Sequence, residues 1–263
     1  MPNRALLTAA TGMQVQQQNV DNIANNLANA STVGFKRTRL EFQDLLYQNM
    51  RTAGGASNAS TPLPVGLQIG LGARTIASEH IFMQGESKQT ENPLDMVIEG
   101  SGFFQVRQTN GDLAYTRAGQ FHLNNQGQVV TATGDSMEPA ITIPTEATSI
   151  SIGKDGTVSV TLVGQSAAQT VGQIQLAIFA NPAGLEALGG NLFKETGASG
   201  QATVGAADAN GIGKISQGYV ENSNVSVVEE LVNMISAQRV YETNSKVIST
   251  ADRMLGTINQ AVS

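Results

Sequence analysis

The chain of 263 residues contains no cysteine and no tryptophan, and it is poor in charged residues. The lack of cysteine excludes a disulfide scaffold, a thiolate zinc site and a cysteine nucleophile. Charged residues make up 14% of the sequence, against roughly 25% in typical globular domains. The 15 basic and 21 acidic residues give a net charge of −6, and no run of lysine and arginine is present to neutralise successive phosphates. Nucleic acid is therefore not an expected partner.

Long apolar runs are also missing. No stretch approaches the roughly 20 apolar residues that a membrane-spanning helix needs. Residues 1–12 lack the basic segment followed by an apolar run that is typical of a secretory signal. We therefore expect neither a membrane helix nor a signal peptide that is cleaved.

The N-terminal region predicts a long helix over residues 3–30, which contain no proline and one glycine, Gly12. Its apolar residues recur at heptad spacing, which places them in one stripe along a helix. The stripe consists of Leu6, Met13, Val20 and Leu27, with Ala9, Ile23 and Ala30 three residues after three of them. We expect the helix to stop near Gly34, because glycine readily adopts the left-handed conformation that ends helices.

A second long helix is predicted near the C-terminal end, over residues 227–260. Ser226, followed three residues later by Glu229, forms the capping-box pattern of a helix start. The apolar residues that follow recur with helical periodicity: Val228, Leu231, Val232, Ile235, Tyr241, Ile248, Leu255 and Ile258. The predicted helices thus flank the rest of the chain.

Between the helices the pattern changes to short strand-like runs separated by turns that contain glycine. The runs cover residues 95–98, 103–107, 113–116, 120–123, 128–131, 149–152, 157–161 and 173–179, with Lys154-Asp155-Gly156 as a hairpin turn. Residues 181–190 are predicted to be irregular or to hold a short helix. The expected fold is α+β: residues 1–34 and 219–263 supply two helices of a coiled-coil-like core domain, and residues 76–218 form a central antiparallel β domain.

Residues 35–75 are predicted to form an extended connecting arm. Within it, residues 51–72 hold two prolines and adjacent glycines and almost no charge, which indicates an extended, irregular stretch and not a strand-rich domain. Several apolar residues of this stretch alternate at period two, so that one edge can bury against another molecule. The predicted contact residues of the arm are Pro62, Leu63, Pro64, Val65, Leu67, Ile69 and Leu71. A mobile loop is the alternative.

The first predicted helix is polar without being charged, which favours self-assembly. Only Arg4 and Asp21 carry charge before Gly34, while asparagine and glutamine fill the faces beside the stripe. In a polymer of identical chains, like charges recur at every subunit, whereas amides donate and accept without that penalty. An ordinary packing stripe within one chain is the alternative interpretation. The predicted polymer-interface residues are Leu6, Met13, Val20, Ile23, Leu27, Val228, Leu231, Val232, Ile235, Tyr241, Ile248 and Leu255.

No pattern of residues predicts catalysis, a metal site or a cofactor site. The two histidines, His80 and His122, lie in different segments without a second ligand at a suitable spacing, and we expect both to be surface or packing residues. The sequence at residues 100–102 lacks the third glycine of a dinucleotide loop. Residues 208–211 begin like a calcium loop but lack the later acidic ligand. We therefore expect a protein that is not an enzyme and holds no cofactor.

One long motif carries a resemblance to a known family. Residues 22–37 (NIANNLANASTVGFKR) resemble the N-terminal signature of the bacterial flagellar rod and hook proteins. The resemblance continues through residues 95–104 (DMVIEGSGFF), 115–121 (YTRAGQF), 217–225 (QGYVENSNV), 229–235 (EELVNMI) and 238–242 (QRVYE). These segments extend over essentially the whole chain.

The resemblance implies a structural subunit of the distal rod, because hook proteins are generally longer and proximal rod proteins are shorter or lack such an arm. A proximal rod or hook protein is the alternative. The resemblance further implies a hollow, self-assembled drive shaft in the flagellar basal body that crosses the periplasm and transmits torque to the hook. The implied partners are copies of the chain itself as a helical homopolymer, proximal rod and hook proteins, the surrounding bushing rings and the flagellar type III export apparatus. Export without cleavage of a signal peptide is part of this expectation.

Two functions of other classes are alternatives. A β-rich binding module with a trimeric coiled coil needs branched apolar residues at nearly all core positions of its heptads, whereas Gln16 and Arg239 interrupt the stripes. A peptidoglycan hydrolase would cleave cell wall measurably, which we do not expect.

Overall fold

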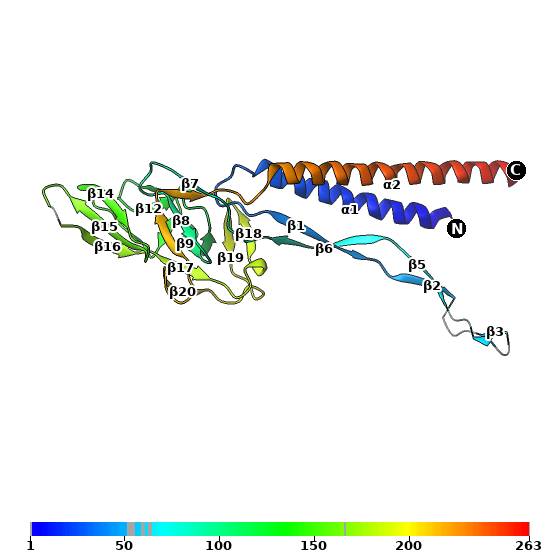
Figure 1. Cartoon of the computed structure of the whole chain (residues 1–263), viewed down its shortest axis with the longest axis horizontal. Coiled ribbons are helices and arrows are strands. Elements are labelled where there is room, and N and C mark those ends of the chain that lie inside the picture. Colours follow the sequence, from blue (N-terminus) through cyan, green and yellow to red (C-terminus); the bar gives the residue numbers. More distant parts are fainter. Residues whose placement is uncertain (1, 52–55, 59–60, 63–64, 166, 263) are drawn as a thin grey trace. The chain divides into compact units, whose positions relative to one another are not determined.

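The computed structural model describes residues 2–51, 56–58, 61–62, 65–165 and 167–262 (Figure 1). The contacts divide the chain into two compact units. One consists of Met1–Leu27, Thr38–Glu79 and Ser226–Ser263, and we call it the helical unit. The other consists of Ala28–Arg37 and His80–Val225, and we call it the β unit. The α+β class is confirmed: a helix lies near each end of the chain, and the middle is rich in antiparallel strands.

The helical unit contains two long helices, α1 (Pro2–Ala28) and α2 (Val227–Val262), whose bounds lie within two residues of the predicted ranges. The expected stop near Gly34 is too late, because α1 already ends at Ala28. Ser226 begins α2 as expected, since its Oγ accepts a hydrogen bond from the amide of Glu229 at 3.5 Å. Glu229 and Glu230 lie in the first turn, where carboxylates interact favourably with the helix dipole. Within the described residues, neither helix has a stretch apolar enough to cross a membrane.

The strands of the helical unit pair in short ladders. Strand β1 (Thr38–Asp44) pairs with β6 (Ala73–His80), β2 (Tyr47–Arg51) with β5 (Leu67–Gly70), and β3 (Ala56–Asn58) with β4 (Thr61–Pro62).

The expectation of an irregular stretch at residues 51–72 is therefore wrong for its described strands. Leu67 and Ile69 alternate with polar and small residues, and the strand that completes their ladder, β2, comes before the glycine-rich segment. Tyr47 pairs with Gly70, and Gln48 with Ile69. Leu63 and Pro64 lie outside the described residues.

The β unit contains the remaining strands. They are β7 (Ser87–Gln89), β8 (Met96–Glu99), β9 (Phe103–Arg107), β10 (Leu113–Thr116), β11 (Phe121–Leu123), β12 (Val129–Thr131), β13 (Ser136–Glu138), β14 (Ala147–Ile152), β15 (Thr157–Leu162), β16 (Gln169–Gln173), β17 (Gln175–Ile178), β18 (Glu186–Gly189), β19 (Leu192–Lys194), β20 (Thr203–Ala206), β21 (Lys214–Gln217) and β22 (Tyr219–Glu221). A short 3₁₀ helix, η1 (Pro182–Gly184), agrees with the short helix expected in residues 181–190, whereas the strand β18 in the same segment was not predicted.

In the described part of the β unit, a nine-stranded sheet runs in the order β11-β12-β13-β9-β10-β19-β18, with β17 beside β9 and β20 beside β17. Strands β14, β15 and β16 form a separate sheet, while β8 pairs with β21 and β7 with β22. The predicted runs at residues 103–107 and 113–116 coincide with β9 and β10. Gly111 and Gly156 have φ angles of 91° and 82° in the turns after β9 and β14, as tight hairpin turns require.

The apolar core lies in the β unit and forms two clusters. The larger one includes Phe104, Val106, Phe121 and Leu176, each fully buried. The smaller one is aromatic: Phe179 packs edge-on against Phe103 and Tyr115, with ring centroids 5.7 and 4.8 Å apart. Aromatic pairs of this geometry add specific attraction to the burial of their area.

Candidate assembly surface

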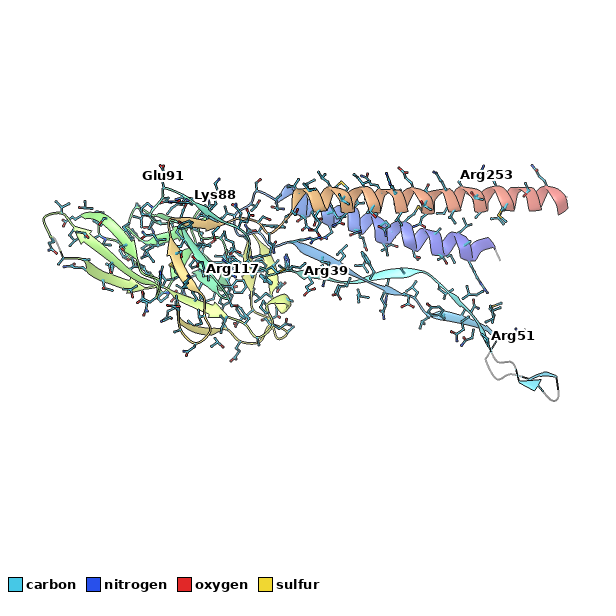
Figure 2. All side chains as sticks on the ribbon, viewed as in Figure 1. Arg39, Arg51, Lys88, Glu91, Arg117 and Arg253 are labelled. Atoms are coloured by element: carbon cyan, nitrogen blue, oxygen red, sulfur yellow. The ribbon has the colours of Figure 1, made fainter. Side chains whose placement is uncertain are left out.

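The outer face of α2 is apolar and exposed. Val228, Leu231, Val232 and Ile235 follow the i, i+3, i+4, i+7 spacing and therefore lie on one side of the helix. Their exposed fractions are 73%, 43%, 61% and 52%. We call these four residues the α2 face. Charged side chains such as Arg253 project further along the helix (Figure 2), where Val240, Tyr241, Val247 and Met254 are also exposed.

The opposite side of α2 is the one that the chain buries. Glu230, Ala237 and Ala251 are buried, and Asn244 is half-buried. The spacing of seven places these residues on one side, roughly 180° from the α2 face at 100° per residue. The helical unit thus packs α2 through small and polar side chains and leaves the large apolar ones outside.

The approach of α1 to α2 depends on a small residue. A Cβ atom on Gly12 would lie 2.8 Å from Asn244 Nδ2, which is closer than a side chain tolerates without movement of the asparagine. Further along, Ala5 of α1 and Val247, Ala251 and Met254 of α2 line an open groove of about 350 Å³. This groove continues the apolar surface of the helical unit.

The predicted stripe of α1 is covered more than that of α2. Ile23 is buried, and Leu6, Met13, Val20 and Leu27 are half-buried. Ile248 and Leu255 of α2 are also half-buried, whereas Tyr241 is exposed. Exposure is therefore greatest at the start of α2.

Some side-chain amides of α1 form hydrogen bonds within the chain, which the sequence analysis did not predict. Asn26 is buried: its Nδ2 donates to Thr38 O, and its Oδ1 accepts from Thr38 N, both at 2.9 Å. Asn22, one turn earlier, donates to the same carbonyl at 2.9 Å. The i, i+4 spacing of the two asparagines was the available signal. They fix the start of β1 against α1.

The strands β2 and β5 expose further apolar residues. Val65 and Leu67 are 71% and 52% exposed, and Ile69 and Leu71 are also exposed. Tyr47, on the neighbouring strand, is exposed as well, and one edge of its ring lies beside Gly70. A two-stranded ribbon with so many exposed apolar side chains is a typical contact surface.

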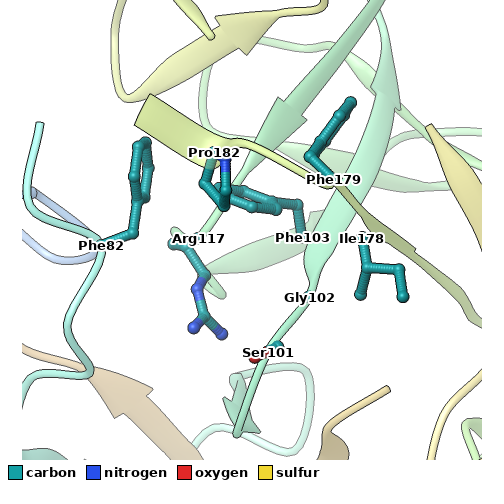
Figure 3. A pocket seen from close by; sticks show the side chains of 8 residues that line it. All are labelled: Phe82, Ser101, Gly102, Phe103, Arg117, Ile178, Phe179 and Pro182. Carbon is teal, nitrogen blue, oxygen red and sulfur yellow. The ribbon is translucent and has the colours of Figure 1, made fainter. Parts of the chain in front are cut away.

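A partly open cavity in the described part of the β unit is too small for a metabolite. It measures about 90 Å³ and is lined by aromatic rings together with Arg117 (Figure 3). Its lining residues are Phe82, Ser101, Gly102, Phe103, Arg117, Ile178, Phe179 and Pro182. Ligand pockets usually reach roughly 300–1,000 Å³, so this volume suits a few water molecules.

Arg117 serves the structure around that cavity. Its Nη2 donates to Gly100 O at 2.8 Å, and its guanidinium lies 5.6 Å from the ring centre of Phe103. Burial lowers the pKa of Arg117, and the nearby carboxylate of Glu221 opposes that shift. These contacts are those of a packing residue.

The residues that were candidates for catalysis or metal binding lie in separate parts of the structure. His80 packs edge-on against Phe193, with centroids 5.5 Å apart, while His122 is exposed on β11. Asp208 and Asn210 adopt positive φ angles in a turn before β21. Over the described ranges, no group of three histidine, aspartate or glutamate side chains is placed to hold a metal ion.

Three family models match the chain. The "Flagella basal body rod protein" model matches residues 6–36, the "Flagellar hook protein FlgE/F/G D1 domain" model residues 97–160, and the "Flagellar basal body rod FlgEFG protein C-terminal" model residues 216–261. The first and last cover most of α1 and α2.

Similar proteins match over nearly their full lengths. The flagellar basal-body rod protein FlgG of Caulobacter vibrioides is 52% identical over 258 residues, 98% of each chain. That of Borreliella burgdorferi is 47% identical, over 97% of each chain, and that of Bacillus subtilis is 38% identical, over 96% of each. The flagellar hook-basal body complex protein FlhP of Bacillus subtilis is 30% identical over 97% of this chain and 98% of its own.

Proposed function

We propose that this chain, which belongs to the bacterial flagellar rod and hook protein family, is a structural subunit of the distal rod. In this proposal, copies of the chain assemble into a hollow tube of the basal body that transmits torque across the periplasm to the hook. The observation that carries the proposal is the α2 face, because a single chain leaves these four apolar side chains exposed to water.

Burial of the α2 face supplies the free energy of assembly. Each valine, leucine or isoleucine that becomes fully buried stabilises a contact by about 1.5–3 kcal/mol. The α2 face points away from the side that its own chain covers, so a second copy can reach it without opening the helical unit. We propose that helices of neighbouring copies pack on it in a coiled-coil-like arrangement together with Leu6, Met13, Val20, Ile23 and Leu27 of α1.

The ribbon of β2 and β5 is the proposed second contact. A shaft must resist bending, so neighbouring subunits need a contact outside the helical core. Val65, Leu67, Ile69 and Leu71 are exposed on or beside β5 and are suited to bury against another copy. Pro62, which the sequence analysis assigned to the same contact, lies at the end of β4.

The wider setting is inferred from the relatives. We propose contacts with proximal rod and hook proteins at the ends of the tube, bushing rings around it, and export of the unfolded chain by the flagellar export apparatus without cleavage of a signal peptide. A different axial role, as a proximal rod or hook protein, is the second candidate, and the 30% identity to a hook-basal body complex protein favours it only weakly. The higher identity to rod proteins favours the distal rod.

Electron microscopy of the purified full chain at rising concentration tests the proposal. We expect globular particles at low concentration and straight tubes above a threshold, because a helical polymer must nucleate. Globular particles at every concentration would contradict self-assembly, and flexible or curved tubes would favour the hook-like alternative. The test uses the full chain, so it does not require the β unit to be stable on its own.

A further inference from the structure

A buried polar cluster in the β unit joins segments from both ends of the sequence. Lys36 and Glu221 are 185 positions apart, yet Lys36 Nζ donates to Glu221 Oε1 at 2.6 Å, and their side chains are 0% and 1% exposed. Lys36 Nζ also donates to Met83 O at 2.7 Å. The amide of Gly85 donates to the same Oε1 at 2.9 Å. Three separate segments therefore depend on one buried carboxylate.

Backbone groups extend this cluster on both sides. The amide of Gly34 donates to Glu221 O at 2.8 Å, and that of Arg37 donates to Asn224 Oδ1 at 2.7 Å. Asn224 Nδ2 donates to Ile81 O, and the amide of Ile81 donates to Arg37 O, both at 2.8 Å. We call residues 34–37, 81–85 and 221–224 the terminal clasp.

Two glycines of the terminal clasp lie too close to neighbouring backbone for a side chain: Gly34 lies against Ala118, outside the clasp, and Gly85 lies against Asn222, within it. Gly34 has a φ angle of 72°, and a Cβ atom there would lie 2.5 Å from the amide nitrogen of Ala118. A Cβ atom on Gly85 would collide with Asn222 O. The clasp is therefore a closely fitted structure, and its hydrogen bonds need all three segments in place at once.

The terminal clasp is held differently from the rest of the β unit. Among the described residues, Phe82 is the one clasp residue that packs against an apolar core cluster. The other contacts are hydrogen bonds and two buried ion pairs of Glu221, one with Lys36 and one with Arg117 at 3.8 Å, whose members are costly to bury unless they are paired. Burial lowers the pKa of Lys36, and Glu221 opposes that shift. Removal of one partner therefore weakens the whole network.

The position of the clasp in the chain gives it a role beyond stability. Helix α1 ends at Ala28, a few residues before Gly34, and α2 begins at Val227, just after Asn224. The clasp thus holds the chain directly after one terminal helix and directly before the other. Elements that open below the global unfolding free energy are typically contiguous groups with little apolar burial.

We propose that the terminal clasp opens and closes as one cooperative unit, separately from the apolar core of the β unit. Closure fixes the segments that connect to both helices at the same time, and opening releases both while the core strands stay paired. The device would let a subunit change the attachment of its two helical ends without unfolding its β core. This inference stands on the contacts within the β unit and does not require the proposed polymer.

Native-state hydrogen exchange of the full chain at low denaturant concentrations tests the proposal directly. The probes are the amides of Gly34, Arg37, Ile81 and Gly85, each of which donates a hydrogen bond within the clasp. We expect them to share one opening free energy and one denaturant dependence, both smaller than those of amides in β9 and β10. Unrelated opening free energies among the four probes would overturn the proposal, as would opening together with β9 and β10.

A pair of variants sharpens the test. In Lys36→Met, Glu221 loses its hydrogen-bonded cation but keeps the guanidinium of Arg117, whose Nε lies 3.8 Å from Glu221 Oε2. We expect the four probe amides to exchange on the order of 100-fold faster while β9 and β10 keep their protection. The control is Lys194→Met, because Lys194 pairs with Asp112 at 3.5 Å on the surface, with 44% and 54% of the side chains exposed. We expect this control to leave all rates unchanged. Faster exchange in β9 and β10 to the same degree, or at Gly85 alone, would overturn the proposal.

Discussion

The β unit buries many of its large apolar side chains, whereas the helical unit leaves several of its own exposed. In the β unit, Phe104 and Leu176 are fully buried in a cluster that the chain completes by itself. In the helical unit, Val228 and Ile235 are 73% and 52% exposed, although they lie on the longest helix of the described chain. One unit has an apolar core of its own, and the other presents apolar surface for a partner to cover.

This difference indicates which unit serves assembly. A chain that folded only to bury its own apolar residues would turn the α2 face toward α1. The helical unit instead uses Ala237 and Ala251 on the covered side, where small side chains permit close approach but bury little apolar area. In the proposed polymer, we therefore expect the stability of the helical unit to depend on neighbouring copies and that of the β unit not to depend on them.

The substitution Ile235→Asp tests whether the apolar surface of the helical unit serves assembly. We expect loss of tube formation, because an unpaired carboxylate buried between subunits costs several kcal/mol and recurs in every subunit. Thermal unfolding of the β unit in the monomer should stay unchanged, since Ile235 is 52% exposed there. Electron microscopy and thermal denaturation followed by circular dichroism measure the two effects.

The matched control for that variant is Val163→Asp. Val163 is 75% exposed, but it lies in the β unit, in the loop after β15. We expect normal tubes from the control. Equal loss of assembly in both variants would show that the α2 face has no special role. Leu27→Asp is a poorer test, because Leu27 is half-buried within its own chain.

The substitution Phe104→Ala tests whether the β unit is stabilised by its own apolar core. The ring of Phe104 is fully buried and packs edge-on against Phe121, with centroids 5.3 Å apart. We expect the free energy of unfolding of the β unit to fall by about 3–5 kcal/mol, because the substitution leaves a cavity. Denaturant unfolding of the monomer measures it. Leu113→Ala, at a site that is 37% exposed on β10, should cost less than about 1 kcal/mol, and similar losses in the two variants would contradict the assignment of the core.

The double substitution Val65→Asn with Leu67→Asn tests the contribution of the β2–β5 ribbon to assembly separately from the contribution of α2. Both side chains are exposed in the single chain, so the ladder of β2 and β5 should persist. We expect tubes that form but bend, because the helical core remains while the second contact loses a few kcal/mol of apolar burial at most. Negative-stain images give the curvature. Tubes as straight as those of the unchanged chain would show that the ribbon does not stiffen the polymer.

The sequence predicted the features that depend on local signals. The heptad spacing and the Ser226 cap gave both helices, and the turns at Gly111 and Gly156 gave the hairpins around them. Within the β unit it missed β7, β13, β16 and β18–β22, whose short and partly polar segments acquire strand structure by pairing with other strands. Pairing over long sequence separations leaves no periodic signal in the strand itself.

The sequence predicted which residues form the candidate surface, but it did not predict that their side chains are exposed. Periodicity placed Val228 and Ile235 on one side of a helix, yet the buried side of α2 holds Glu230 and Ala237, which an apolar pattern does not mark. The contact of Lys36 with Glu221 had no local signal either, since it depends on how the whole β unit closes. Small and polar residues decide both arrangements, and hydrophobic periodicity does not register them.

The smallest expected effect is a pH dependence confined to the β unit, and it concerns Tyr115. Burial raises the pKa of Tyr115 from 10.0 to about 12, and the carboxylate of Glu195, 3.4 Å from the phenolic oxygen, adds to the shift. The folded chain therefore keeps a proton that the unfolded chain loses, and the resulting stability is present below the unfolded pKa and is lost as the pH rises toward the folded pKa. Between about pH 10 and about pH 12, we expect the unchanged chain to lose about 1 kcal/mol per pH unit more than Tyr115→Phe, because the variant has no phenol to ionise. Denaturant unfolding of both proteins across that range isolates the difference, since lysines titrate alike in both. Parallel stability curves would show that the phenol of Tyr115 ionises as readily in the folded chain as in the unfolded one.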